Sequence, residues 1–149
     1  MAFAPGYTIV SPRIVELSFI SATGTTALAG TVSYSGTSVH DIAANLLAPV
    51  NKSVVDKASP VIIGTKLFDS NGNGKIDGIR FGFPETLVGT SSGVIASVAG
   101  YVVTGYTISG TGLTAVLAEG ANPDTGATPL VLLQNTTLAD VAGNTVASE

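Results

Sequence analysis

One stretch of sequence decides the fold class: Pro60-Val61-Ile62-Ile63-Gly64-Thr65-Lys66-Leu67-Phe68-Asp69-Ser70-Asn71-Gly72-Asn73-Gly74-Lys75-Ile76-Asp77-Gly78-Ile79-Arg80-Phe81-Gly82-Phe83. Residues 60–68 have the composition of a strand. Residues 78–83 alternate, so that Ile79, Phe81 and Phe83 share one face of a second strand. Between the two runs lie residues dominated by Asp, Asn and Gly, which are typical of turns. The stretch therefore predicts two strands joined by a tight polar loop.

The rest of the chain continues this alternation of short apolar runs and turn residues. Further strands are predicted at residues 100–109, 113–118 and 130–134, with a last short one near 145–146. Helical periodicity is nearly absent. About eight short strands, with a turn signal every ten residues or so, predict an all-β fold and specifically an antiparallel immunoglobulin-like β-sandwich. A jelly roll or an open barrel is the alternative, because the strand count fits these folds as well.

The sandwich is predicted to occupy residues 58–149, and residues 1–57 to form an N-terminal extension that packs on or beside it. In the extension, residues 13–19 alternate as a half-buried strand does. Residues 28–34 follow after a turn, so the two segments are expected to form an N-terminal β-hairpin. No internal repeat of the sequence is convincing.

Residues 39–50 are the only segment with a helical pattern. Asp41 is expected to cap this helix, and Pro49 ends it. The residues that follow, up to Pro60, are predicted to form a polar connection.

The loop between the two quoted strands carries oxygen-bearing side chains at alternate positions. Asp69, Asn71, Asn73 and Asp77 fall at positions 1, 3, 5 and 9, and the carbonyl of Lys75 falls at position 7. Calcium takes about six to eight oxygen ligands, and this alternation curls such ligands around one centre. These five residues are therefore the predicted ligands of a calcium ion.

The loop departs from the EF-hand pattern. Position 12, where an EF-hand has a bidentate Glu, is Arg80, so an EF-hand is excluded. Glu85, Asp124, Asp140 or backbone oxygens are the candidates for the remaining ligands, and Ile76 is expected to anchor the loop in the core. The alternative is a plain hairpin turn, in which Asn-Gly pairs supply positive φ and Asx side chains bond their own backbone.

The loop and its flanks, residues 67–85, resemble the opening hairpin of immunoglobulin-like repeats from bacterial and archaeal surface proteins. In that family the motif D-x-N-G-N-G-K-I-D precedes a strand and a segment like F-S-E-P-V. Matching motifs follow in order: residues 102–109, L-A-E-G at 117–120, D-T-G-A-T-P at 124–129 and L-A-D-V-A-G-N at 138–144. The resemblance covers about residues 60–146 and implies an immunoglobulin-like spacer, adhesive or assembly module without catalysis. The chain departs from the family in reading Phe83-Pro84-Glu85, which puts Glu85 as a ligand in doubt.

Composition favours a protein that works in an assembly. The chain is 45% apolar and only 11% charged, with a net charge of −4, whereas soluble domains carry about 25% charged residues. Some apolar surface is therefore expected to be covered by other protein subunits, in a homo-oligomer or a larger assembly. All six basic residues lie in the first 80 positions, so no basic face for nucleic acid is expected. No apolar run approaches the roughly 20 residues of a membrane span, and membrane insertion is not expected.

Sequence patterns of catalysis are weak, and the chain is predicted not to be an enzyme. His40 and Asp41 lie near Ser38, but a lone His beside an Asp in a polar turn is far more often a cap or a surface pair. The glycines form no phosphate-binding loop. There is no Trp, so the stacking platform of a sugar-cleaving cleft is not expected, and no Cys, so disulfide and thiol chemistry are excluded.

Two kinds of assembly fit these features. Residues 1–6 lack the basic n-region and apolar h-region of a signal peptide, which favours a virion component of a phage, such as a capsid decoration (cement) or tail protein. The alternative is an extracellular module of a cell surface or filament, adhesin-like or S-layer-like, completed by strand exchange and stabilised by calcium. The family resemblance favours this second setting. A carbohydrate-binding or enzymatic module ranks third.

Overall fold

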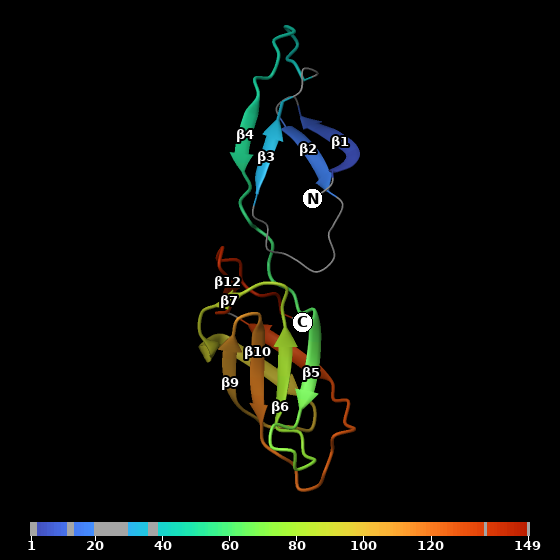
Figure 1. Ribbon diagram of the computed structural model, residues 1–149, viewed down its shortest axis with the longest axis vertical. Helices are drawn as coiled ribbons and strands as arrows, with labels where there is room; N and C mark the ends of the chain where they lie inside the picture. Colours follow the sequence, from blue (N-terminus) through green and yellow to red (C-terminus); the bar gives the residue numbers. More distant parts are fainter. Residues whose placement is uncertain (1–2, 12–13, 20–29, 36–38, 136, 149) are drawn as a thin grey trace.

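The protein folds almost wholly into antiparallel β-strands. The computed structural model describes residues 3–11, 14–19, 30–35, 39–135 and 137–148. In chain order the strands are β1 (Phe3–Ser11), β2 (Ile14–Phe19), β3 (Thr31–Tyr34), β4 (Val50–Ser53), β5 (Gly64–Phe68), β6 (Gly78–Gly82), β7 (Leu87–Val88), β8 (Val94–Val98), β9 (Val103–Ser109), β10 (Gly112–Leu117), β11 (Val131–Asn135) and β12 (Ala139–Asp140). A 3₁₀ turn, η1 (Ser91–Gly93), precedes β8. Figure 1 shows β1–β4 in one group and β5–β12 in a second.

The second group is a β-sandwich. One layer is a four-stranded antiparallel sheet in the order β5-β6-β10-β9, and the other contains the pair β11-β8. Apolar side chains from both layers form one core, as expected where two sheets bury their apolar faces together. Its buried members are Ile76, Ile79, Phe81, Phe83, Leu87, Val94, Ala96, Val98, Leu113, Ala115, Leu117, Leu133, Leu138 and Val146. The predicted all-β sandwich is confirmed, whereas the immunoglobulin-like assignment and the division at residues 57 and 58 stay predictions.

Strand β6 follows the predicted alternation. Ile79 and Phe81 are each 1% exposed, and Arg80 between them is exposed. On the neighbouring strand β10, Leu113 lies opposite Phe81 and Ala115 opposite Ile79. The centre of the core is therefore built from cross-strand apolar pairs, the unit of sheet stabilisation.

Most of the predicted strands of the sandwich are present with shifted ends. The segments at 100–109, 113–118 and 130–134 correspond to β9, β10 and β11. The strand expected near 145–146 is reduced to an isolated bridge between Thr145 and Ala139. Strand β8 was not predicted, although its burial alternates as that of a half-buried strand does.

The predicted N-terminal hairpin is wrong in its pairing. Strand β2 pairs with β1, with Tyr7 opposite Leu17, and β3 pairs with β4. The reason is the unexpected strand β1, whose Pro5 and Gly6 hid it in the sequence. The expected turn and the start of the expected second strand, residues 22–29, lie outside the described residues.

The predicted helix at residues 39–50 is also wrong. Asp41 does accept the backbone N–H groups of Ala43 and Asn45, at 2.8 and 2.9 Å, but it closes a turn rather than capping a helix. Ala44 has φ of 65°, the left-handed conformation that ends helical winding. Local bonds from the Asp side chain compete with a helix in this way.

The same turn occurs in the sandwich. Asp140 accepts the backbone N–H and the Nδ2 of Asn144, both at 2.8 Å. Asp41 accepts the same two groups of Asn45, both at 2.9 Å. In each turn the N–H of the Asp donates to the carbonyl of the Asn at 3.0 Å. The two turns lie 99 positions apart in the sequence.

The correspondence continues on both sides of the turn. Leu47 N–H donates to the carbonyl of Val39, and Val146 N–H to that of Leu138, each at 2.9 Å. Gly143 is left-handed, with φ of 89°, in the position that Ala44 has in the first turn. These matched bonds and backbone conformations mark two copies of one local structure.

Strands β1 and β9 share a tetrapeptide at the same separation. Gly-Tyr-Thr-Ile occurs at residues 6–9 and again at 105–108, 99 positions later. The Tyr lies opposite a residue of the next strand in both ladders, Tyr7 with Leu17 and Tyr106 with Ala115. The expectation that the chain has no internal repeat is therefore wrong. The repeat is weak at the level of sequence, because identity is confined to a few scattered positions.

Candidate metal centre

Residues 69–77, called the Asx loop below, connect β5 to β6 at one end of the sandwich. Gly72 and Gly74 have φ of 74° and 84°, which glycine adopts without steric cost. Ile76 is 2% exposed and belongs to the core, as predicted. The loop is thus fixed to the buried strand that follows it.

The side chain of Asp69 organises the Asx loop. Its Oδ1 accepts the N–H groups of Gly72 at 2.7 Å and Asn73 at 3.3 Å, and its Oδ2 accepts that of Gly74 at 2.7 Å. Burial raises the pKa of Asp69, but these N–H groups outweigh burial and hold the pKa below its ordinary value. The carboxylate is therefore kept in the charged form that a cation ligand requires.

The other predicted ligands also bond within the loop. Asn71 Oδ1 accepts the N–H of Asn73 at 3.0 Å, and Asn73 Oδ1 accepts that of Lys75 at 2.9 Å. Asp77 accepts the backbone N–H of Ser70 at 3.1 Å and also its hydroxyl. An amide or carboxylate oxygen has a further lone pair, so these bonds suit both a plain turn and a cation loop. The five predicted ligands lie in one compact loop, and calcium binding there stays a prediction.

Glu119 holds the Asx loop from the other side and was not expected there. One of its oxygens accepts the Nδ2 of Asn71 at 2.7 Å, and both accept the Nδ2 of Asn73, at 2.9 and 3.0 Å. Glu119 follows β10, far from the loop in sequence, so only the folded sheet brings it near. It adds a carboxylate to the loop's surroundings.

Of the three distant acids considered as further ligands, only Asp124 contacts the loop. It accepts the N–H of Ile76 at 2.7 Å and the hydroxyl of Tyr101 at 2.6 Å. The bond from Tyr101, followed by that from Ile76, lowers the pKa of Asp124. Glu85 and Asp140 lie elsewhere, because β6 runs from the loop to the opposite end of the sandwich.

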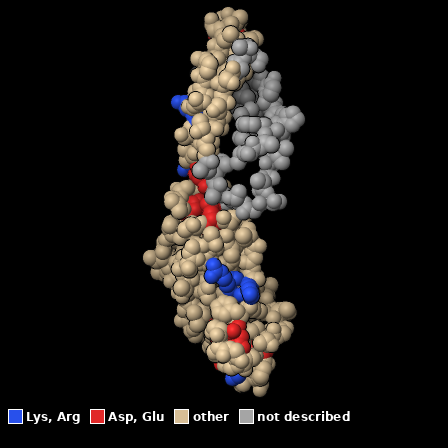
Figure 2. Space-filling view, viewed as in Figure 1, with Lys and Arg blue, Asp and Glu red and all other residues tan. Residues whose placement is uncertain are grey.

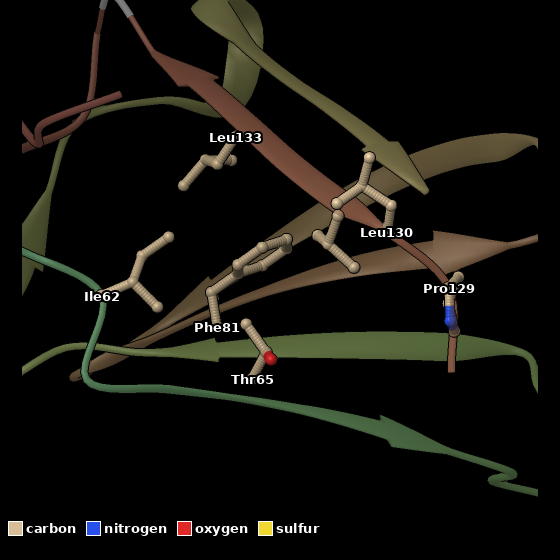
Figure 3. Close-up of a pocket in the computed structure, with 7 residues that line it drawn as sticks. Ile62, Thr65, Phe81, Pro129, Leu130 and Leu133 are labelled. Atoms are coloured by element: carbon tan, nitrogen blue, oxygen red, sulfur yellow. The ribbon is translucent and has the colours of Figure 1, made fainter. Parts of the chain in front are cut away.

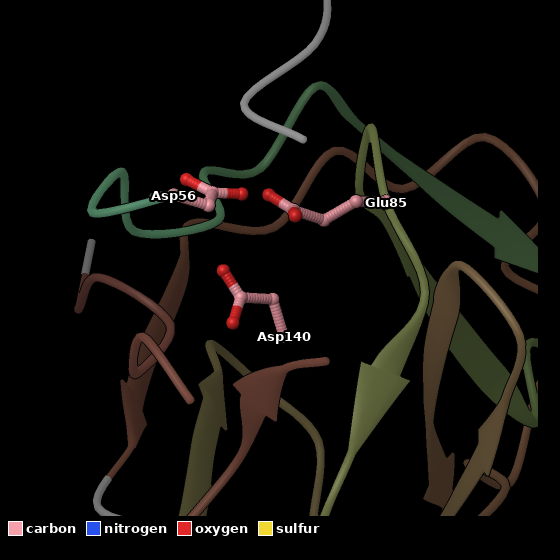
Figure 4. Close-up of side chains that lie close together, drawn as sticks. All are labelled: Asp56, Glu85 and Asp140. Carbon is pink, nitrogen blue, oxygen red and sulfur yellow. The ribbon is translucent and has the colours of Figure 1, made fainter. Parts of the chain in front are cut away.

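Glu85 and Asp140 instead form an acidic cluster with Asp56 (Figure 4). Asp56 belongs to the chain after β4, Glu85 to the turn between β6 and β7, and Asp140 to β12. One oxygen of each lies within 4.8 Å of the others. Asp140 is 1% exposed and Glu85 8%. Within the described part of the chain, it is the one group of three acidic, His or Cys side chains with metal-like spacing.

The acidic cluster divides charge unevenly. Burial raises the pKa of Glu85, and the charges of Asp140 and then Asp56 raise it further. Burial also raises the pKa of Asp140, but hydrogen bonds from Asn144 and the turn backbone outweigh burial and lower it. Asp140 therefore holds its charge, and Glu85 is biased toward the protonated form. A proton or a divalent cation would each relieve the repulsion, so the cluster is a second candidate for calcium.

A small cavity opens between the edges of the two layers (Figure 3). Its volume is about 290 Å³, and it lies between β5 and β6 on one side and β11 on the other. The side chains around it are Ile62, Thr65, Phe81, Pro129, Leu130, Val131 and Leu133. None of these seven is ionisable, so the lining offers no group for acid–base chemistry.

Comparison with known proteins returned no relative. No family model, curated protein or solved structure matches the chain. No helix among the described residues is long and apolar enough to cross a membrane.

Proposed function

We propose that the chain is a non-enzymatic structural protein that works by assembling with other protein subunits. The observation that carries this proposal is the exposed apolar surface of the first group of strands. No described residue from 30 to 59 is buried. Ile42 is fully exposed, and Val55 and Leu46 are 69% and 58% exposed. Isolated two-stranded ladders are marginal in water, so this group needs a covering partner.

The surface of the sandwich supports the same proposal. Figure 2 shows that most of the visible surface carries neither acidic nor basic side chains. Large apolar side chains are exposed there too, among them Val141 at 77%, Leu130 at 74% and Val102 at 67%. A surface with so few charges favours association over a freely soluble monomer.

The internal repeat bears on the setting of this assembly. A phage virion component, located in the capsid or tail, remains one candidate. The alternative is an extracellular module of a cell surface or filament. Repeated units stacked along a chain are typical of extended surface and filament proteins, and the resemblance to surface-protein repeats adds to this. We therefore favour the extracellular setting.

Sedimentation velocity of the whole chain tests the assembly proposal. Association that rises with protein concentration is expected, because burying the exposed apolar side chains of the first group against another molecule is favourable. A variant with Leu46→Ser, Leu47→Ser and Val55→Ser is expected to associate roughly tenfold more weakly. The control, Val102→Ser with Val141→Ser, removes two exposed apolar side chains from the sandwich. It is expected to change association much less, because the sandwich has a buried core of its own whereas no described residue from 30 to 59 is buried. A chain that stays a monomer at all concentrations contradicts the proposal.

Calcium is proposed as a stabilising ion held by the Asx loop. Calcium at a hundred times its dissociation constant is expected to raise the free energy of unfolding by about 3 kcal/mol. The rise should vanish when Asp69 and Asp77 are both replaced by alanine. Glu85→Gln, in the acidic cluster, is the control that should keep it. Thermal unfolding with calcium and with a chelator measures both, and equal midpoints for the unaltered chain would refute an occupied site.

A further inference from the structure

We propose that the described residues between 3 and 47 form the second half of another sandwich and that they bind a polypeptide segment with the strand pattern of residues 58–99. That segment would supply the missing first half. The proposal deepens the proposed function, because it names the surface through which the chain assembles and the chemistry of the partner.

The first group of strands repeats part of the sandwich. Strands β1 and β2 pair antiparallel, as β9 and β10 do, although the register differs by one residue at the 99-residue separation. The turn at Asp41 has the bonds of the turn at Asp140. In the sandwich, β10 has β6 on its other edge and β5 beyond it, and β11 pairs with β8. Among the described strands, β2 has only β1 as a partner. Among the described strands, the first group thus has counterparts of β9, β10 and β11 but none of β5 and β6, and β3 pairs with β4 where β11 pairs with β8.

Burial differs between matched positions of the first group and the sandwich. Val39 is 40% exposed and Leu47 is 47% exposed, whereas their counterparts Leu138 and Val146 are 0% and 3% exposed. Asp140 is buried, with 1% of its surface exposed, whereas its counterpart Asp41 is exposed. The local structure is the same, so the difference measures the cover that the first group lacks.

The residues that share a core with these positions in the sandwich indicate the chemistry of the partner. In the sandwich, Leu138 and Val146 belong to one core with residues of β6 and β8, among them Ile79, Phe81, Val94, Ala96 and Val98, and Asp140 pairs with Leu87 of β7. The partner is therefore a polypeptide segment that has the strand pattern of residues 58–99. It must lack the strands that correspond to residues 100–149, so that its apolar face is free to bind. A second copy of the chain cannot supply this segment, because in each copy it is already covered by residues 100–149, so self-association would cover the first group by apolar contact without completing a sandwich. Edge strands and apolar faces are the usual means of such strand addition.

A fusion tests this directly. A copy of residues 58–99 is placed immediately before residue 1, which restores the continuity that residues 99 and 100 have in the chain. Hydrogen exchange is then followed at the backbone amides of residues 30–35 and 39–53. Protection is expected to rise by at least about 100-fold over the unfused chain, because these amides become part of a packed unit.

Two controls make the result specific. In the first, Ile79→Asp and Phe81→Asp are placed in the added copy alone, and no gain in protection is expected. In the second, Asp41→Ala is compared in both proteins. It should leave unfolding of the unfused chain unchanged and should lower the unfolding midpoint of the fusion, because the turn becomes buried there.

A second arm guards against a fusion that aggregates. A separate polypeptide of residues 58–99 is titrated into the whole chain, and the same gain in protection is expected. The proposal is overturned if neither arm protects these amides. It is also overturned if the chain alone gains equal protection as it dimerises, since the partner would then be a second copy. Association of the chain without complementation would leave the proposed function intact and sink only this inference.

Discussion

Phe81→Ala is expected to lower the free energy of unfolding by about 3–5 kcal/mol. Phe81 is 1% exposed, and it is paired with Leu113 on the adjacent strand. It also lines the cavity between the layers, as Leu133 does. Deleting the ring would enlarge a space that the surrounding strands cannot close, so the lost contacts would not be replaced. Urea unfolding, with its midpoint and slope, measures the loss.

Phe68→Ala is the matched control for Phe81. Phe68 ends the adjacent strand β5 and is only half-buried, and its ring lies over Gly78 on the outer face of the sheet. A loss of about 1–2 kcal/mol is expected, because less apolar area returns to water on unfolding. Equal losses for the two variants would show that the core does not lie between the layers as described.

Asp140→Ala is expected to lower the free energy of unfolding by about 2–4 kcal/mol. The substitution removes the acceptor for the backbone N–H and the Nδ2 of Asn144, both bonded at 2.8 Å. It also relieves the repulsion on Glu85, which offsets part of the loss. Asp41→Ala removes the same two bonds from the exposed turn and is expected to leave unfolding unchanged. Thermal or urea unfolding of the two variants compares one turn in two environments.

The effect of Asp140→Ala depends on pH in a definite direction. The pKa of Asp140 is lower in the folded protein than its ordinary value, because its hydrogen bonds outweigh burial. Its contribution to stability is therefore present above the ordinary pKa and is lost as the pH falls through the folded pKa. The stabilities of the unaltered chain and of Asp140→Ala should converge in acid. A gap that stays constant down to strongly acidic pH would mean that the carboxylate charge plays no part.

The core strands could be predicted from sequence because a half-buried strand has a period of two. Ile79, Arg80 and Phe81 show it plainly. The Asx loop could be located for a similar reason, since all its Asp and Asn residues are near neighbours. The acidic cluster could not, because Asp56, Glu85 and Asp140 meet only when three distant segments fold together. The predicted pairing of the N-terminal strands was wrong for a similar reason. Which strands pair depends on all the strands that are present, and the alternation within one strand does not reveal its partner.

The turn at Asp41 is predictable from the sequence. Asp41 and Asn45 have the spacing of Asp140 and Asn144, which belong to the D-x-A-G-N motif of the sequence. What hid the match was Ala44, which stands where the second turn has Gly143 and adopts its left-handed conformation. The prediction of a helix at residues 39–50 rests on apolar spacing, with Asp41 as the cap and Pro49 as the end. A short motif that makes its own hydrogen bonds outweighed that spacing.

The exposure of the described residues from 30 to 59 should lower the heat-capacity change of unfolding. The heat capacity of unfolding and the sensitivity to denaturant both scale with the surface that unfolding newly exposes to water. A segment already open to water adds little to either quantity. The isolated chain should therefore unfold with the heat-capacity change of a protein well below its length of 149 residues. The shortfall in the heat-capacity change would measure how much of the molecule is packed only after the partner binds.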